Sequence, residues 1–557
     1  MPDEKRKRKL DRRSFLRNSG LAAGGVAGIT AVAPFASAIT QGSEAMRSLV
    51  RNGLTETADP SRSGARDDSF KPAPQDGGNG ATATATPASP TRAGAARVGE
   101  VSLSWQFARW VAGLRYEDLP AAVVDRAKGL TLQALSSALL GSQLPQGKEA
   151  VRLMLEEEAG ARNGATILVN GAKSTKGGAA FANSEMIYAA GKLDSFRMLT
   201  HPGTTIVPCA LAAAEVQGAS GREFIAALAA GYEVMERMAA DFIPTVMARG
   251  FHASPVFGIF GGVIAAGKIL RFSENEMTDA IGLCVDLAGS NLQSAALREG
   301  AAAHNAMLAV LLAKQGHPGG EAALEGDAGF YHAYAGNNRG ELTYSFTGAR
   351  HADLAKITAN LGKDWILLET LYRVYSIAGY NIAHIDVTAK LCEEHNIRYA
   401  DVDRVEAVVN WLETQYPSPA FATRREDIGE AKPGSTRYYT AYGVVKRGFP
   451  LLAPPAGAAD PPEVLELMKR VTIIPSHDMG LFAPRITIFT KDGKSYTRQA
   501  TGREFIWDFG EEARRIREVI PGLPIPAARF EEIIATCRDL DRQERADRLV
   551  QLTLASA

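Results

Sequence analysis

The sequence predicts a mostly helical protein in which an α/β segment is inserted between two helical parts. Apolar residues recur at helical spacing from Leu103 onward. After about residue 360, short strand-like apolar runs replace this pattern, and from about residue 511 the chain is helical again. The predicted domains are a helical domain, an α/β domain and C-terminal helices that return to the helical domain, over residues 98–360, 361–505 and 506–557.

The first 38 residues have the composition of an export signal. A basic stretch over residues 5–17 precedes a Gly/Ala-rich apolar run and the small-residue cleavage pattern Ala36-Ser37-Ala38. The pair Arg12-Arg13, followed by Ser-Phe-Leu-Arg, resembles a twin-arginine signal. We therefore expect residues 1–38 to engage the twin-arginine export machinery and the mature protein to be periplasmic or extracellular. A retained N-terminal anchor and a basic nucleic-acid-binding arm are the alternatives.

Residues 39–97 separate this signal from the folded part. They are rich in Gly, Ala, Ser, Thr, Pro and Asp, and the low-complexity stretch over residues 81–96 lacks large apolar side chains. Such a segment buries too little apolar surface to offset the entropy lost on ordering. We interpret it as a disordered linker.

The helical domain is predicted from apolar stripes and from helix-boundary residues. The first helix spans Leu103 to Leu114, and a second begins near Pro120 and ends at Gly141. Ser273 and Glu276 have the spacing of a capping box. Further helices are expected over residues 179–190, 207–216, 221–239, 254–270, 274–288 and 300–315.

The apolar run over residues 256–270 is too short to span a membrane, which takes about 20 apolar residues, and it contains Lys268. We predict a buried helix there. The apolar run of the leader is also short and rich in glycine. The mature protein is therefore expected to have no stable membrane span.

Strand patterns mark the α/β domain. Residues 405–411 and 471–475 are β-branched and apolar. Two further runs, over residues 486–490 and 495–500, flank Asp492-Gly493. An Asp-Gly pair supplies the positive φ angles of a type I′ turn, so these runs are predicted to form a hairpin.

Composition excludes several classes of protein. The 62 Lys and Arg residues balance the 62 Asp and Glu residues, whereas a nucleic-acid binder carries a basic excess. Four Cys in 557 residues exclude a disulfide-built scaffold. Phosphate-binding glycine loops, HExxH and paired CxxC motifs are all missing from the sequence. Nucleotide, zinc and iron–sulfur sites therefore have no sequence support.

Several segments together resemble the MmgE/PrpD family, which includes 2-methylcitrate dehydratases and cis-aconitate decarboxylase. The most specific begins HPGTTIVPCALAAAEVQ at His201 and runs to Val234. The resemblance covers roughly residues 100–555. Further matching segments are RGFH at 249–252, EGAAAHNAMLAVLLAKQG at 299–316, YRVYSIAGYNIAHID from 372, and the stretch from Arg437 to Gly448.

The resemblance implies a large all-helical domain with an inserted α/β lid. It also implies a homodimer that uses neither a metal nor an organic cofactor. The implied substrates are small di- or tricarboxylates held between the helical domain and the lid. The implied chemistry is elimination next to a carboxylate, with loss of water or of CO2. Such chemistry requires cations for carboxylates, a base and an acid.

Five residues match family positions that carry proton chemistry: His201, His252, Asp194, Tyr375 and Tyr439. Histidine suits either proton role near neutral pH. Each also has a structural interpretation, because a His, Asp or Tyr at such a place can cap a helix or fill the core. The run around Asp194 departs from the family, which has several acids where this chain has one.

Arg298, Arg373 and His384 are the candidate substrate-binding residues. Arg373 stands near a family Lys, and its guanidinium keeps the charge but does not donate a proton. A second family Lys is missing, because Ala295 and Ala296 occupy that region. Arg298 binds a carboxylate there or stands as a solvated charge at the helix start. His384 contacts substrate or lies in the core.

Three functions remain open at this point. The first is an exported lyase that dehydrates, or decarboxylates, a citrate-like polycarboxylate through histidine-mediated proton abstraction. The second is a diverged, non-catalytic member that binds a carboxylate ligand, which the missing Lys and shortened Asp run would explain. The third is an isomerase that uses the same proton abstraction.

Overall fold

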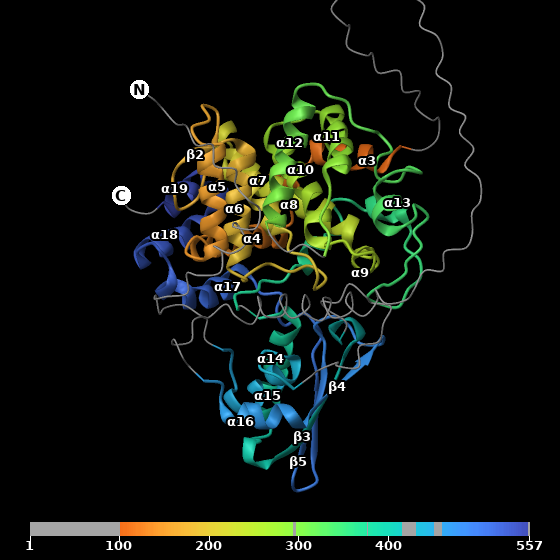
Figure 1. The fold of residues 1–557 in the computed structure, drawn as a ribbon, viewed down its shortest axis with the longest axis vertical. Helices are drawn as coiled ribbons and strands as arrows, with labels where there is room; N and C mark the ends of the chain where they lie inside the picture. Colours follow the sequence, from red (N-terminus) through yellow and green to blue (C-terminus); the bar gives the residue numbers. More distant parts are fainter. Residues whose placement is uncertain (1–100, 293–296, 376, 415–430, 451–458, 555–557) are drawn as a thin grey trace, which may run out of the picture. The chain divides into compact units, whose positions relative to one another are not determined.

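The structure is a computed structural model that describes residues 101–292, 297–375, 377–414, 431–450 and 459–554. The predicted export signal and linker lie outside the described residues. Apart from Ala459, the described residues belong to one unit of the chain. Helices make up most of this unit, and strands of a four-stranded sheet occur late in the sequence (Figure 1). The predicted fold class, mostly α with an α/β part, is confirmed.

The first helical part begins as the sequence predicts. In α3 (Leu103–Gly113) the N-cap Ser102 accepts a hydrogen bond from the backbone N–H of Trp105. Helix α4 (Ala121–Gly141) follows Pro120. The helices that follow are α5 (Pro145–Glu157), α6 (Lys176–Ala189), α7 (Gly203–Gln217), α8 (Gly221–Ala239), α9 (Ile243–Ala248), α10 (Ala253–Ile269), α11 (Glu274–Leu287), α12 (Arg298–Lys314) and α13 (Phe330–Ala335).

Helix α10 forms the centre of this part, and it is the buried helix predicted from the apolar run. All of its residues except Lys268 are buried, and it packs against α7, α8 and α12. The packing is close because of glycines. A Cβ on Gly231 of α8 would lie 2.7 Å from the carbonyl oxygen of Gly261 in α10. Within the described residues, no helix is long and apolar enough to cross a membrane.

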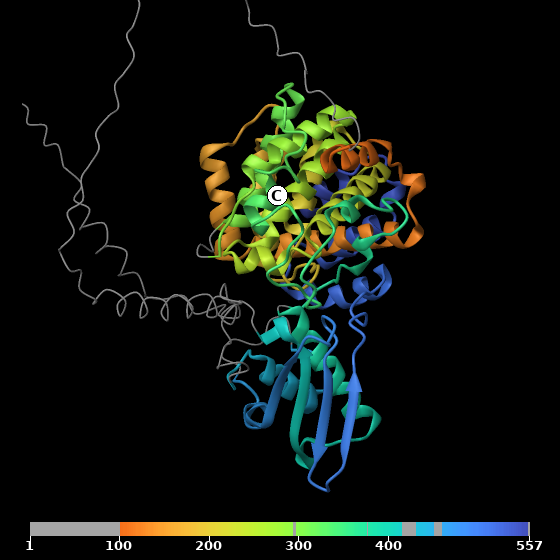
Figure 2. The ribbon, with the colours of Figure 1, turned by 90° about the vertical axis from the view of Figure 1, so that its right-hand side faces the viewer.

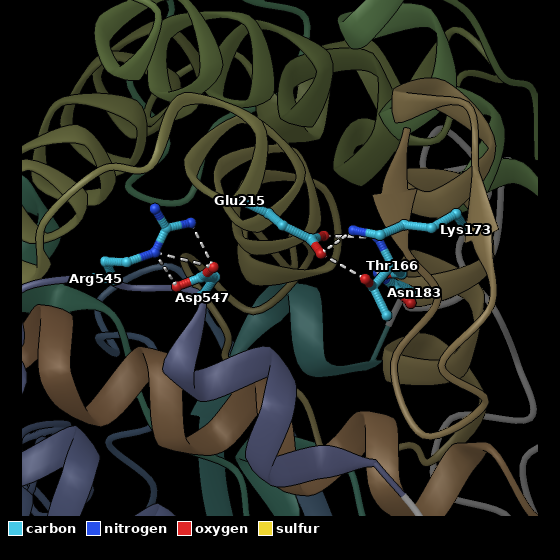
Figure 3. A network of polar contacts seen from close by, with 6 residues as sticks. All are labelled: Thr166, Lys173, Asn183, Glu215, Arg545 and Asp547. Carbon is cyan, nitrogen blue, oxygen red and sulfur yellow. Dashed lines mark hydrogen bonds and ion pairs between the residues drawn. The ribbon is translucent and has the colours of Figure 1, made fainter. Parts of the chain in front are cut away.

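A short hairpin is attached to the end of α7 by a polar network (Figure 3). Strand β1 (Ala165–Thr166) pairs antiparallel with β2 (Lys173–Ser174). Glu215 of α7 accepts hydrogen bonds from the backbone N–H of Thr166 at 2.6 Å and from its hydroxyl at 2.5 Å. The same carboxylate pairs with Lys173. The hairpin is therefore held by the half-buried carboxylate of Glu215 and by Asn183 of α6, whose side chain donates to the carbonyl oxygen of Thr166 at 3.1 Å.

The C-terminal segment packs against α4. It contains α17 (Phe509–Ile516), α18 (Ala527–Arg538) and α19 (Arg548–Thr553). Helices α17 and α18 both contact α4, and α18 also contacts α19. Just before α19, Arg545 and Asp547 form an ion pair beside Glu215 (Figure 3). Segments from the two ends of the described chain thus share one helical core.

The four-stranded sheet has the order β4-β3-β5-β6 (Figure 2). Strand β3 runs parallel to β4 and antiparallel to β5, which pairs antiparallel with β6. Helix α14 packs on β5 and β6, while α15 packs on β4 and on α14. The elements are α14 (Gly379–Glu394), β3 (Val402–Asn410), α15 (Thr436–Lys446), α16 (Pro462–Leu467), β4 (Val471–Ser476), β5 (Arg485–Thr490) and β6 (Ser495–Gln499).

The predicted hairpin over β5 and β6 is confirmed, but the predicted type I′ turn is wrong. Gly493 has φ +84°, whereas Asp492 is not among the residues with positive φ. The backbone N–H of Gly493 donates to Thr490 O, and the N–H of Thr490 donates to Lys494 O. This is a three-residue loop, a type I turn followed by a left-handed glycine. One glycine therefore suffices for the reversal.

Candidate active site

His201 lies immediately before α7, and its ring has a defined orientation. Its backbone N–H donates to Ser254 Oγ at 3.1 Å. Its ring Nδ1 lies 2.8 Å from the backbone carbonyl oxygen of Asp194. Because a carbonyl oxygen only accepts, Nδ1 carries the hydrogen and Nε2 keeps its lone pair. Burial, then the charge of Arg373, lowers the pKa of His201 to about 3, so the ring is a neutral base at Nε2.

The loop that precedes His201 is backbone-strained. Arg197 and Met198 have φ of 49° and 69°, in the left-handed region that residues with a side chain rarely adopt. Phe196 and Thr200 form an isolated antiparallel bridge across this turn. Strained backbone of this kind persists where the surrounding structure holds it, and it is frequent at functional sites.

Asp194 joins this loop to two helices. Its Oδ2 accepts hydrogen bonds from the backbone N–H of Gly203 at 2.8 Å and from the hydroxyl of Tyr232 at 2.6 Å. Burial raises the pKa of Asp194 to about 6, while these two donors and Arg373 act in the opposite direction. The predicted residue Asp194 thus orients His201 through its carbonyl oxygen and anchors the start of α7 through its carboxyl group.

The first turns of α7, α10 and α12 meet at one buried carboxyl group. Glu299 Oε2 accepts hydrogen bonds from Thr204 Oγ1 of α7 at 2.9 Å and from Ser254 Oγ of α10 at 3.3 Å. Each helix start carries a partial positive charge of about half a unit. Three such starts in one place favour an anion, and they stabilise a carboxylate bound beside them.

His252 is the N-cap residue of α10 and lies beside Glu299. Its Nδ1 is 3.8 Å from Glu299 Oε1. Burial, then the charges of Arg298 and His201, lowers the pKa of His252 well below its ordinary value. Burial raises the pKa of Glu299 to about 7. The structure therefore brings both predicted histidines together, with a buried carboxyl group that the sequence interpretation did not select.

The two predicted arginines lie close enough to His201 for the charge of each to lower the pKa of His201. Arg298 is the first residue of α12, is only partly exposed, and lies 3.4 Å from Tyr188 OH through Nη2. Arg373 is buried and donates to the carbonyl oxygen of Gly191 at 2.9 Å. The site thus holds two cations suited to carboxylates.

Lys192 is a further cation that the sequence interpretation missed. The side chain of Gln133 donates to the carbonyl oxygens of both Lys192 and Arg373, at 3.0 and 3.3 Å. Burial, then the charge of Arg373, lowers the pKa of Lys192 to about 8, and Glu518 opposes this. The signal that could have identified Lys192 is its position two residues before Asp194. The sequence alone does not reveal that Lys192 is buried.

The two predicted tyrosines have contacts elsewhere. Tyr375 stacks on Phe449 with ring centroids 4.4 Å apart, and its hydroxyl lies 3.3 Å from Arg515 Nη1. Tyr439 is buried in α15 against Tyr438, and burial raises its pKa to about 12. The structure shows neither in contact with the His201 group.

His384 also lies apart from the histidine pair, in the core of the α/β part. Its Nδ1 is 2.7 Å from Thr440 Oγ1, and its Nε2 is 3.5 Å from Glu413 Oε2. The side chain has no exposed surface. Among the two interpretations left open by the sequence, these contacts match the core position.

Across the described residues, no group of three or more His, Cys, Asp or Glu is placed to hold a metal ion. These residues form a site that contains a buried pair of histidines, three helix starts and adjacent cations. In this pair, Nε2 of His201 carries no hydrogen. Such an arrangement has the chemical groups needed to bind a small anion and to move a proton to or from it.

The chain is similar to several known proteins. The chain is 27% identical over 344 residues to a cis-aconitate decarboxylase-like protein of Aspergillus oryzae, covering 58% of this chain and 68% of the relative. It is 27% identical over 433 residues to cis-aconitate decarboxylase of Aspergillus terreus, covering 70% and 83%. It is 24% identical over 435 residues to the enzyme of that name from Mus musculus, covering 72% and 82%. Residues 105–343, which include both histidines and Glu299, match the MmgE/PrpD N-terminal domain.

Proposed function

We propose that this chain is an MmgE/PrpD lyase that decarboxylates cis-aconitate or a closely similar unsaturated polycarboxylate. The observation that carries the proposal is the buried pair His201 and His252, enclosed by three helix starts with Arg298 and Arg373 beside it. The similarity to cis-aconitate decarboxylases supports the reaction class.

Decarboxylation requires one proton. The electron pair of the broken C–C bond stays in the carbon framework as CO2 leaves, and one carbon atom takes a proton. His201 is unsuited to deliver it, because Nδ1–H is bound to a carbonyl oxygen and Nε2 is bare. His252 has no such restriction, so we assign it the donor role. The arginines hold the remaining carboxylates.

Dehydration of a citrate-like hydroxy acid is the second candidate. The observation that favours it is the bare Nε2 of His201, which is a base for the proton next to a carboxylate. His252 would then give its proton to the departing hydroxide, which leaves as water. The two reactions share the donor and differ in their need for His201.

Incubation of the protein with cis-aconitate, citrate and 2-methylcitrate, followed by NMR of the products, tests the proposal. We expect CO2 loss from cis-aconitate. The substitution His252→Asn places a favourable N-cap residue at the start of α10 and removes the imidazole. His252→Asn is therefore expected to lower kcat for decarboxylation by about 10²- to 10⁴-fold, the usual contribution of a general acid.

His201→Asn is the matched variant, because its amide can still donate to Asp194 O. It should remove any dehydration, which needs Nε2 as a general base, and should lower decarboxylation by less than His252→Asn does. Absence of turnover with every acid, together with a thermal shift caused by the same acids, would overturn the lyase proposal and favour a carboxylate-binding protein.

A further inference from the structure

Glu299 and His252 face each other with two polar atoms that make no hydrogen bond. Glu299 has no exposed surface, and the His252 side chain is 8% exposed. Glu299 Oε2 is occupied by Thr204 and Ser254. Glu299 Oε1 and His252 Nδ1 are both buried without a hydrogen-bond partner among the described residues, and they lie 3.8 Å apart. A buried polar atom without a partner is costly, so such a pair indicates a function.

We propose that Glu299 is a positioning residue that supplies, through His252, the proton delivered to the substrate. This inference rests on the lyase function proposed above. It assigns to Glu299 a role that Asp194 is not placed to fill, since the Asp194 carboxyl group is occupied by Gly203 and Tyr232.

The transfer balances in protons and charge. Before the step, Glu299 is a neutral acid with its hydrogen on Oε1, and His252 carries its hydrogen on Nε2. As the substrate carbon takes the proton from Nε2, Nδ1 takes the proton from Glu299. The N–H and O–H bonds break, and the C–H and Nδ1–H bonds form. The negative charge ends on Glu299, beside Arg298 and the starts of three helices.

The distance allows this step after a small movement. A hydrogen bond from the Glu299 Oε1–H to His252 Nδ1 needs about 2.8 Å between the two atoms, so the observed 3.8 Å must shorten by roughly 1 Å. A carboxyl group reaches this by rotation about its own side-chain bonds. Oε1 makes no hydrogen bond that this movement would break, whereas Oε2 must keep its contacts with Thr204 and Ser254 as the group turns.

Charged groups on the neighbouring elements favour a relay, in which a proton passes from Glu299 through His252, over a stable imidazolium on His252. His252 faces Arg298 and His201, which together with burial lower its pKa well below the ordinary value. Glu299 faces Arg298 on its own helix and Glu185 on α6, and burial raises its pKa to about 7. The pKa of Tyr188 of α6 is raised by burial, and the charge of Glu299 acts in the same direction. A proton is therefore held better by the carboxyl group than as a second charge on His252.

Glu299→Gln is the diagnostic variant. The side-chain oxygen of Gln can still accept from Ser254, which leaves the amide NH2 facing Nδ1. Gln has no proton to give, so kcat for decarboxylation should fall by about 100-fold, the lower end for general-acid catalysis. KM should change much less. In the wild type, kcat should fall as pH rises through about 7, because Glu299 must be protonated. This fall is the high-pH limb of the pH–rate profile, and the variant should lack it.

Two further variants separate the relay from a structural role. Glu185→Gln is the matched control. Glu185 of α6 is also a buried carboxyl group beside the start of α12, but it accepts hydrogen bonds from the N–H of Gly300 and from the side chain of Gln146. It should retain the limb near pH 7. Glu299→Asp keeps a carboxyl group and should restore part of kcat together with the limb. A limb that persists unchanged in Glu299→Gln would overturn the inference.

Nitrogen NMR of the ¹⁵N-histidine-labelled protein without substrate gives a readout independent of turnover. As pH rises through about 7, ionised Glu299 should accept from Nδ1–H, so the hydrogen of His252 should move from Nε2 to Nδ1. Glu299→Gln should keep the hydrogen on Nε2 at every pH. If the tautomer changes but no acid is turned over, the lyase proposal fails alone. If acids are turned over and the wild-type tautomer does not change, the relay fails alone.

Discussion

At the residue scale, the site is built from ionisable groups that burial keeps close to neutral. The pKa of His201 is lowered and that of Asp194 is raised, in both cases mainly by burial. Between about pH 3 and pH 6, both groups are therefore mostly uncharged in the core. A substrate carboxylate would bring a negative charge into a space that holds Arg298 and Arg373 but few ionised acids.

Asp194 gives a prediction for the pH dependence of stability. Its pKa rises from 3.8 to about 6 on folding, so between these values the folded state binds more protons than the unfolded state. The free energy of unfolding should therefore decrease as pH rises from about 4 to 6, by roughly 3 kcal/mol from this group. Asp194→Asn, whose oxygen can still accept from Gly203 and Tyr232, should lack this contribution.

Urea unfolding of both proteins at half-unit steps from pH 4 to 7 measures the difference. The stability of Asp194→Asn relative to the wild type should increase with pH and level off above pH 6. Two parallel curves over this range would contradict the shifted pKa of Asp194.

At the scale of elements, the site depends on how three helix starts are brought together. Helices α7, α8, α10 and α12 pack closely because small residues line their contacts. Thr204 and Ser254 then reach one carboxyl group from two different helices. A shift of one helix would separate donors whose distances now lie between 2.9 and 3.3 Å.

Gly231→Ala tests this close packing. The added Cβ would lie 2.7 Å from the backbone oxygen of Gly261, an atom that does not move without its helix. We expect a loss of about 1–3 kcal/mol in the free energy of unfolding, the usual cost of overpacking. Gly113→Ala, where nothing lies within 4 Å of the added Cβ, is the matched control and should change stability by less than about 1 kcal/mol. Equal effects of the two substitutions would show that the contact is not tight.

Helix positions were predictable because their signals are local. The Ser273 and Glu276 capping box forms as expected, and Gly141 ends α4. Helices α5, α9 and α13 were not predicted. α9 and α13 have six residues each, too few to show a period, and α5 buries only Gly147, Ala150 and Met154.

At the scale of the whole molecule, the predicted export signal gives a testable prediction of where the protein acts. Replacing both Arg12 and Arg13 by Lys preserves the charge and removes the arginine pair. In a bacterium with a twin-arginine pathway, we expect the wild type in the periplasmic or extracellular fraction and the double variant in the cytoplasm. Immunoblots of cell fractions measure this. Equal export of both proteins would contradict the twin-arginine interpretation.

The sequence by itself determined the elements whose signals lie within a few residues, the mostly helical class and the hairpin, and it predicted His201 as a site residue. Only the tertiary structure decided which residues lie next to one another. Glu299 meets Thr204 across 95 residues of sequence, Lys192 is buried beside Arg373, and His384 lies in a separate core. The physical reason is that helix and turn formation depend on local spacing, whereas burial and pKa depend on packing between segments remote in sequence.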